Sequence, residues 1–327
     1  MEYRRLGKSG LQVSALSLGS WLTFGKQISD DVAEQLMDIA YENGVNFFDN
    51  AEIYATGKSE IVMGNILKKK NWARSSYIVS SKVFFGYEDK LPNQIGLSRK
   101  HVIEGCNAAL KRLQVDYIDL FFCHRPDKNT PIEETVWAMN TLLQQGKILY
   151  WGTSEWSAQE LLEAHIVAKQ NNLIGPTMEQ PQYNMFEREK LEKDYLHIFN
   201  HQGLGTTIWS PLHSGLLSGK YNDGFPADTR LGIEGMDWLK DRTLAEEKID
   251  KTRKLTVLAK KINIPVAIMS IAWCLKNLNV STVILGASKT EQLKQNFTAL
   301  EAQSLLTAEV LEEIETILQN KPVQAMF

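Results

Sequence analysis

The stretch that decides the fold is residues 77–124, which read YIVSSKVFFGYEDKLPNQIGLSRKHVIEGCNAALKRLQVDYIDLFFCH. It begins and ends with short runs of mostly apolar residues, at 77–82 and 118–124, which are typical of buried strands. Between them Ser98 can cap a helix, whose apolar residues fall on one face: Val102, Ile103, Ala109, Leu110 and Leu113. A strand, a helix and a second strand in this order predict two parallel strands joined by a crossover helix.

The same alternation extends along most of the chain. Ser29 or Asp30 can cap a helix that ends at Asn43 and Gly44, and Pro131 suits the first turn of another. Helical patterns also occupy residues 59–70, 158–171, 187–202 and 290–299. Strand patterns occupy residues 15–18, 46–49, 77–82, 118–124, 148–154, 177–180, 206–210 and 283–286. Eight strands, each followed by a helix, predict the α/β class and a closed (β/α)₈ TIM barrel.

The alternative is a doubly wound open sheet, but no GxGxxG motif follows the first strand. Two segments lie outside the repeat. Residues 3–13, with glycines at 7 and 10, predict an N-terminal β-hairpin that caps the barrel floor. Residues 211–241 form a long loop after strand seven, and loops of this length are usually functional. We expect one domain over residues 1–327, with a C-terminal tail from about residue 321.

Composition narrows the class of protein. Hydrophobic residues make up 43% and charged residues 23% of the chain, as in ordinary globular proteins. The formal charge of -3 gives no electrostatic reason to bind nucleic acid or an anionic membrane. No continuous apolar run follows the basic N-terminus, so we expect no signal peptide, no membrane insertion and a cytoplasmic location.

No metal site is predicted. The three cysteines are too widely spaced for a CxxC site or a disulfide framework. His197 and His201 have a metal-compatible spacing, but no glutamate follows His197 as an HExxH site requires.

Reactive side chains gather where neighbouring strands end. Strands two, three and four end at Asp49, Lys82 and His124, and Tyr54 lies in the loop after Asp49. Barrel enzymes build their active sites at this face. Each residue alone has an ordinary structural explanation, as a helix cap, a surface charge, a core histidine or a packing tyrosine. Their joint placement favours a catalytic site.

This set of side chains suits proton transfer to a carbonyl oxygen. A tyrosine has a pKa of about 10, and the ammonium of Lys82 is expected to stabilise the phenolate and lower the pKa of Tyr54. Asp49 would keep Lys82 charged and oriented, and His124 can hydrogen-bond the substrate oxygen. No side chain donates hydride, so carbonyl reduction would need a nicotinamide cofactor.

The last strand and its helix suit an anionic cofactor. Residues 286–290, GASKT, join the strand to the helix start. Backbone N–H groups at such a junction, together with Lys289, predict a phosphate site. Small residues in the segment 209–215, WSPLHSG, allow a close backbone approach after strand seven.

Eight segments, taken in order, resemble those of the aldo-keto reductases. They are YRRLGKSG (3–10), FDNAEIY (48–54), GLSRKH (96–101), RPD (125–127), TP (130–131), YWGTS (150–154), WSPL (209–212) and LGAS (285–288). The resemblance covers residues 3–322 and is most marked for the branch that contains the β subunits of voltage-gated potassium channels and their bacterial relatives.

The resemblance implies NADPH-dependent reduction of aldehydes or ketones to alcohols. Tyr54 would be the general acid, Lys82 and Asp49 would tune it, and His124 would orient the carbonyl. NADP(H) would lie across the barrel mouth, its nicotinamide end near Trp21, its pyrophosphate near Lys220 and its adenosine phosphate near Ser288. The implied cofactor contacts are Ser20, Trp21, Gln27, Asp49, Ser154, Gln180, Trp209, Ser210, Pro211, Leu212, Ser214, Lys220, Arg230, Gly286, Ser288, Gln292 and Asn296.

Two departures from the channel subunits separate the possible functions. This chain has His124 where they carry Asn, as in catalytic members, and Glu155 where they carry Arg. The first interpretation is therefore a reductase of small-molecule carbonyl substrates. The alternative is a redox-sensing partner subunit that docks on a channel's cytoplasmic domain and turns over slowly, and a cofactor-binding scaffold is a third. The resemblance also implies a homo-oligomer, a tetramer or larger.

Overall fold

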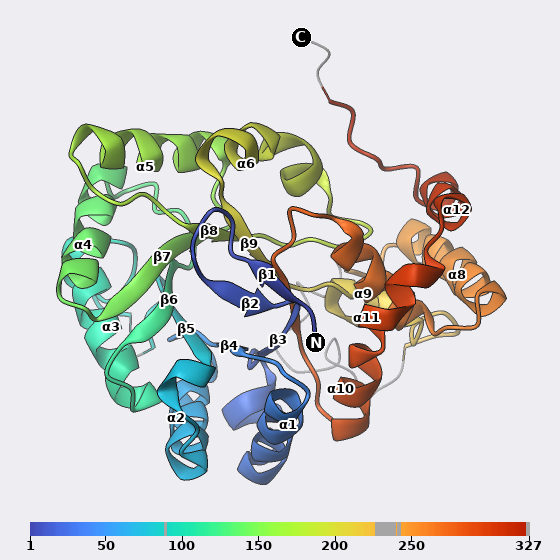
Figure 1. Cartoon of the computed structure of the whole chain (residues 1–327), viewed down its shortest axis with the longest axis horizontal. Helices are drawn as coiled ribbons and strands as arrows, with labels where there is room; N and C mark the ends of the chain where they lie inside the picture. The colour runs from blue at the N-terminus through green and yellow to red at the C-terminus, as the bar shows by residue number, and fades with distance from the viewer. Residues whose placement is uncertain (88–89, 226–239, 241–242, 325–327) are drawn as a thin grey trace.

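Eight parallel strands close into a barrel, seen down its axis in Figure 1. The computed structural model describes residues 1–87, 90–225, 240 and 243–324. The strands lie in the order β10-β3-β4-β5-β6-β7-β8-β9. Their bounds are β3 Leu16–Gly19, β4 Phe47–Asp49, β5 Ile78–Val83, β6 Ile118–Cys123, β7 Ile148–Ser154, β8 Met178–Gln180, β9 Gly205–Ile208 and β10 Thr282–Leu285. The predicted (β/α)₈ barrel is confirmed, and the alternative prediction of an open doubly wound sheet is wrong.

A hairpin covers one end of the barrel, as predicted. It consists of β1 Tyr3–Arg5 and β2 Gln12–Ser14, which pair antiparallel. Apolar side chains from the hairpin and the strands form one buried cluster inside this end: Leu6, Val13, Phe47, Ile78, Leu120, Phe122, Met178 and Ile284. The barrel interior is therefore packed at its floor, and a large cavity opens toward the carboxyl ends of the strands.

Helices surround the barrel and pack their apolar faces on it. Three serines begin helices by accepting a backbone N–H: Ser29 for α1, Ser98 for α3 and Ser157 for α5. The helix bounds are α1 Asp30–Glu42, α2 Lys58–Lys70, α3 Arg99–Leu113, α4 Ile132–Gln144, α5 Ala158–Gln170, α6 Leu196–Gln202, α8 Glu246–Lys261, α9 Val266–Lys276, α10 Thr290–Phe297, α11 Ala299–Ala302 and α12 Ala308–Leu318.

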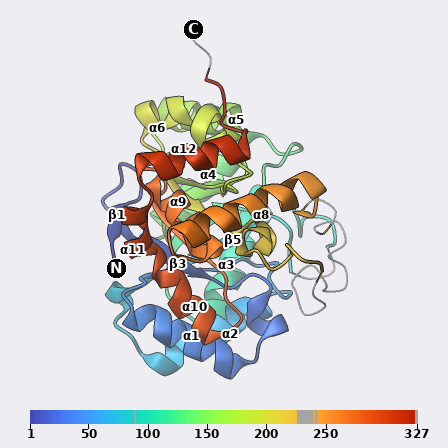
Figure 2. The same ribbon diagram turned by 90° about the vertical axis from the view of Figure 1, so that its right-hand side faces the viewer.

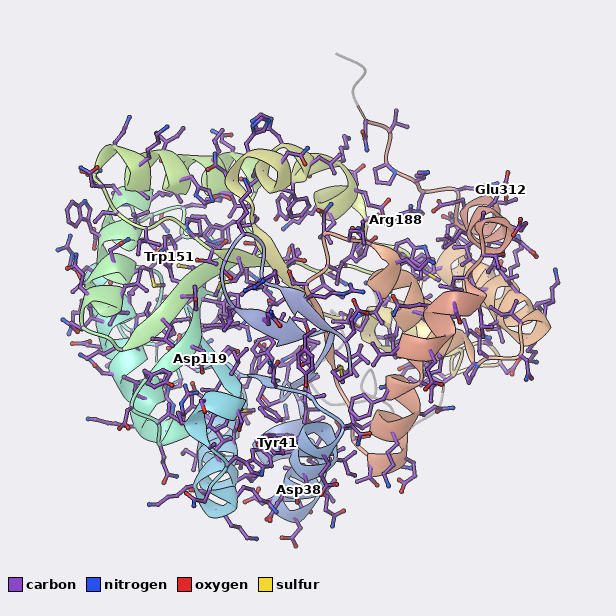
Figure 3. All side chains as sticks on the ribbon, viewed as in Figure 1. Asp38, Tyr41, Asp119, Trp151, Arg188 and Glu312 are labelled. Atoms are coloured by element: carbon purple, nitrogen blue, oxygen red, sulfur yellow. The ribbon has the colours of Figure 1, made fainter. Side chains whose placement is uncertain are left out.

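The helix expected at residues 187–202 is wrong in its first half. A π-helical segment, η3, spans Lys190–Asp194, and α6 begins after it. The side chain of Arg188 is 3% exposed and donates to the carboxylates of Glu192 and Glu315, which lies in α12. Figure 3 shows Arg188 pointing toward α12. A charge buried in this way needs its partners, so tertiary pairing shapes the chain here.

Helices α8, α9 and α12 have no counterpart in the sequence prediction. α9 is buried on nearly all sides, so it lacks the polar face by which a surface helix is recognised. Figure 2 shows α8 and α12 running side by side over the outside of the barrel, and their contacts agree. Within the described part of the chain, no single helix is long and apolar enough to cross a membrane. Helices α8 and α9, which are bent relative to each other by 90°, reach that length and composition only when they are taken together.

Adjacent strands hold the residues at the barrel rim in register. Lys82 lies opposite Phe122, and Asp49 lies opposite Gly19. Asp119, near the start of β6 and labelled in Figure 3, accepts from the backbone N–H of Val79 at 2.9 Å and so joins β6 to β5. The rim residues therefore occupy fixed heights on their strands.

The close approach of β7 and β8 gives a test of this packing. A methyl group at Gly152 would lie 2.2 Å from the backbone oxygen of Met178. We expect Gly152→Ala to lower the free energy of unfolding by about 1–3 kcal/mol because the strands must move apart. Urea unfolding measures this, with Gly10→Ala as the control, since no heavy atom lies within 4 Å of a methyl group there. Equal midpoints for the two variants would contradict the packing.

Candidate active site

Lys82 is the centre of the rim, and its side chain is fully buried. β5 carries it into the barrel mouth, where its ammonium donates three hydrogen bonds. The acceptors are Asp49 Oδ2 at 2.7 Å, the backbone oxygen of Asn50 at 2.6 Å and the Tyr54 hydroxyl at 3.3 Å. All three ammonium protons are thus directed to partners, and one of them points at a phenolic oxygen.

Asp49 is fixed by several strands besides its own. Its Oδ1 accepts from the hydroxyl of Ser80 at 2.8 Å and from the amide of Gln180 at 3.0 Å. The hydroxyl of Ser20 donates to its backbone oxygen at 2.9 Å. The carboxylate therefore has no freedom to leave Lys82, and the ion pair belongs to the barrel rather than to a loop.

Tyr54 lies in the loop between β4 and α2, which turns sharply after it. Ala55, Thr56 and Gly57 all have left-handed backbone conformations, with φ of 49°, 55° and 80°. Burial raises the pKa of Tyr54 well above its usual value, the charge of Asp49 adds to this, and Arg125 opposes it. The sequence-based expectation of a lowered pKa is therefore wrong for this structure. Tyr54 keeps its proton at neutral pH, as a proton donor must.

His124 stands at the end of β6 with its ring edge-on to Tyr54, 5.8 Å between ring centroids. Burial lowers its pKa well below the usual value, and the nearby charges of Lys82 and Arg125 lower it further. The imidazole is therefore neutral at pH 7 and retains one N–H donor. Among the described residues none accepts from or donates to its buried Nδ1.

A cavity of about 880 Å³ opens above these side chains. Asp49, Tyr54 and His124 line one end of it, and Lys82 lies beneath them. Of the predicted cofactor contacts, the cavity is lined by Trp21, Gln27, Asp49, Ser154, Gln180, Trp209, Ser210, Pro211, Leu212, Ser214, Lys220, Gly286, Ser288, Gln292 and Asn296. Ser20 is buried under Asp49 instead. Arg230 lies outside the described residues.

The wall after β9 is shaped for an anion. Ser210, His213, Ser214 and Gly215 have left-handed backbone conformations, so the chain turns tightly here. A methyl group at Gly215 would lie 2.8 Å from the ammonium nitrogen of Lys220, so the absence of a side chain leaves a cradle beside that charge. The residues present therefore fit a phosphate-bearing cofactor.

The far end of the cavity lies at the start of α10. The backbone N–H and hydroxyl of Ser288 donate to Gln292 Oε1 at 3.1 and 3.3 Å, which fixes the turn into the helix. Lys289 lines the cavity at this turn. A cation next to a helix N-terminus is a suitable environment for a second phosphate.

Glu155 has a structural role that its position in the sequence did not reveal. Its backbone is left-handed, with φ of 63°. Its carboxylate accepts from the indole N–H of Trp209 at 3.0 Å, the backbone N–H of Gln182 at 2.6 Å and Lys190 at 2.7 Å. Although burial acts to raise its pKa, Lys190 holds the pKa of Glu155 below its usual value. Glu155 thus fixes Trp209 in the cavity wall.

Glu52 also has a structural role that its position in the sequence did not reveal. Its Oε1 accepts from the backbone N–H groups of Phe84 and Gly86, both at 2.8 Å. These bonds fix the loop that carries Phe85, whose ring meets His124 edge-on at 5.1 Å. Nothing in the spacing of residues 49–54 indicates this role, because the partner loop is more than thirty residues away.

The family of the protein follows from comparison with known sequences. A model of the aldo/keto reductase family matches residues 15–319, nearly the whole chain. The chain therefore belongs to the aldo/keto reductase family. This membership makes it an oxidoreductase of the class that uses nicotinamide cofactors to reduce carbonyl groups.

A buried acid beside the site gives a pH prediction. Burial raises the pKa of Glu179 from 4.5 to about 8, so the native state binds an extra proton between these values. Wild-type stability should therefore fall as pH rises through this window, whereas Glu179→Gln lacks this dependence. The variant should gain stability relative to wild type by up to about 1.4 kcal/mol per pH unit, measured by urea unfolding at several pH values between 5 and 8. A difference independent of pH would contradict the shift.

Proposed function

We propose that this protein reduces aldehydes or ketones to alcohols with NADPH as the reductant. The observation that carries the proposal is the buried chain from Asp49 through Lys82 to the Tyr54 hydroxyl, 2.7 and 3.3 Å long at its two steps, at the end of the cavity. A proton donor backed by a cation is what a carbonyl oxygen needs as it gains charge.

In this proposal Tyr54 gives its phenolic proton to the carbonyl oxygen. The ammonium of Lys82 then stabilises the phenolate that remains, because it already donates to the same oxygen. Burial lowers the pKa of Lys82, although the charge of Asp49 opposes this. Neutral His124 donates a hydrogen bond that orients the carbonyl. NADPH, when bound, supplies the hydride.

The preference for NADPH is part of the proposal. Ser288, Lys289 and Gln292 gather at the start of α10, and Lys220 lines the cavity after β9. Two cationic regions along one cavity suit a dinucleotide with an additional phosphate, because each charge meets a separate anionic group.

Replacing the proposed acid is the direct test. Tyr54→Phe removes only the hydroxyl, so we expect turnover of an aldehyde to fall by about 10²–10⁴-fold while NADPH affinity is kept. NADPH oxidation and fluorescence titration measure the two quantities. Tyr41→Phe is the matched control, since its hydroxyl bonds Ser76 on the outside of the barrel. Undiminished turnover in Tyr54→Phe would reject this assignment.

Cofactor preference has its own test. Lys289→Gln should raise the KM for NADPH by about tenfold, the order expected for one charged hydrogen bond, and should leave the KM for NADH nearly unchanged. Lys294→Gln, at the other end of α10 and outside the cavity, controls for general charge. An equal loss with both cofactors would contradict the assignment of Lys289 to the additional phosphate.

A further inference from the structure

Arg125 follows His124 directly at the end of β6 and lines the same end of the cavity as Tyr54. One nitrogen of its guanidinium holds the side chain in place. Nη1 donates to the backbone oxygen of His124 and, at 3.3 Å, to the hydroxyl of Ser154. The guanidinium is therefore anchored beside the proposed acid, although neither anchor is charged.

The other edge of this guanidinium has no protein partner in the described part of the chain. Neither Nε nor Nη2 donates to a described residue, and no described carboxylate forms an ion pair with Arg125. The Nε–Nη2 edge is one that binds a carboxylate with two parallel hydrogen bonds.

Among the described residues, the two carboxylates that line this end of the cavity already have partners. Asp49 is paired with Lys82 at 2.7 Å. Glu155 is paired with Lys190 at 2.7 Å and holds Trp209. Arg125 therefore forms an ion pair with neither of them, although its charge helps to lower the pKa of Glu155.

An apolar surface lies next to this charge. The Phe85 ring is 5.8 Å from Arg125 Cζ and meets the His124 ring at 5.1 Å. Glu52 fixes the loop that carries Phe85. A substrate could thus place its carbon skeleton on Phe85, its carbonyl at Tyr54 and an anionic group at Arg125.

We infer that Arg125 is a specificity-determining residue that binds a carboxylate of the substrate, so that the preferred substrates are oxo-carboxylates. This inference rests on the proposed function. In the reaction, the carbonyl carbon takes a hydride from NADPH and the carbonyl oxygen takes the proton of Tyr54. The products are a hydroxy-carboxylate and NADP⁺, and the carboxylate itself is unchanged.

The test compares each anion with its neutral ester. Glyoxylate, succinate semialdehyde and 4-formylbenzoate span different separations between carbonyl and carboxylate, and each is paired with its methyl ester. Arg125→Gln should lower the ratio of kcat/KM for acid over ester by tenfold or more in at least one pair. Comparing this ratio between variant and wild type cancels the intrinsic reactivity of the compounds. A change below tenfold in all three pairs would overturn the inference.

Lys128→Gln is the matched control. It removes the same charge from the same loop, but Lys128 is exposed and pairs with Glu160 outside the cavity. Its ratios should equal those of wild type, and a matching drop would mean that general charge, not Arg125, attracts the acids. Turnover of the esters by Arg125→Gln shows that this variant is folded. If it does not reduce the esters, the same comparison is made with Arg125→Lys.

A binding measurement separates this inference from the proposed function. If wild type reduces none of the six compounds, the proposed function fails. Calorimetric titration of benzoate into the protein with NADP⁺ then tests Arg125 alone. Binding that is at least tenfold weaker in Arg125→Gln supports the site, whereas equal binding, or none to wild type, overturns it.

Discussion

The structure of the site depends on one buried ion pair, Lys82 with Asp49. Burying two charges is costly unless their geometry is good and their remaining hydrogen bonds are satisfied. Here the ammonium has three acceptors, and the carboxylate also accepts from Ser80 and Gln180. These partners come from β4, β5, β8 and the loop after β4. Closure of the barrel therefore brings together the partners that offset the cost of burying the pair, and a distorted barrel would leave an unpaired charge.

The same burial sets the protonation of the groups above the pair. It raises the pKa of Tyr54 and lowers that of His124, so both side chains are neutral hydrogen-bond donors at pH 7. The cavity thus offers hydrogen-bond donors to the oxygen of a bound carbonyl group. The ammonium of Lys82 is already in place to stabilise the phenolate that would form on Tyr54. Glu155 and Glu52 act on the walls of the cavity rather than on the donors themselves. Glu155 accepts from the indole N–H of Trp209, and Glu52 accepts from the backbone N–H groups on either side of Phe85. These bonds define the walls around the donors.

Much of the architecture could be predicted from the sequence. All eight strands were expected within two residues of their observed bounds, because buried parallel strands are marked by short apolar runs. Asp49, Lys82 and His124 could be placed on one rim because each ends such a run. Helix α9 could not be predicted, because a helix that is buried on nearly all sides shows no periodic polar face. The pKa of Tyr54 was expected in the wrong direction, since a sequence shows the nearby cation but not the depth of burial. The role of Glu155 depends on Trp209 and Lys190, which lie 54 and 35 residues away, so no local pattern reveals it.

In the proposed reaction, the Lys82–Asp49 pair enables Tyr54 to release its proton. The most direct measurement is the single-turnover rate of aldehyde reduction by the NADPH-loaded protein, compared between wild type and the charge-neutral double variant Lys82→Met with Asp49→Asn. The double variant avoids leaving one buried charge unpaired. We expect the double variant still to bind NADPH and its rate to fall by about 10²-fold or more. A rate equal to that of wild type would show that the ion pair does not act on Tyr54.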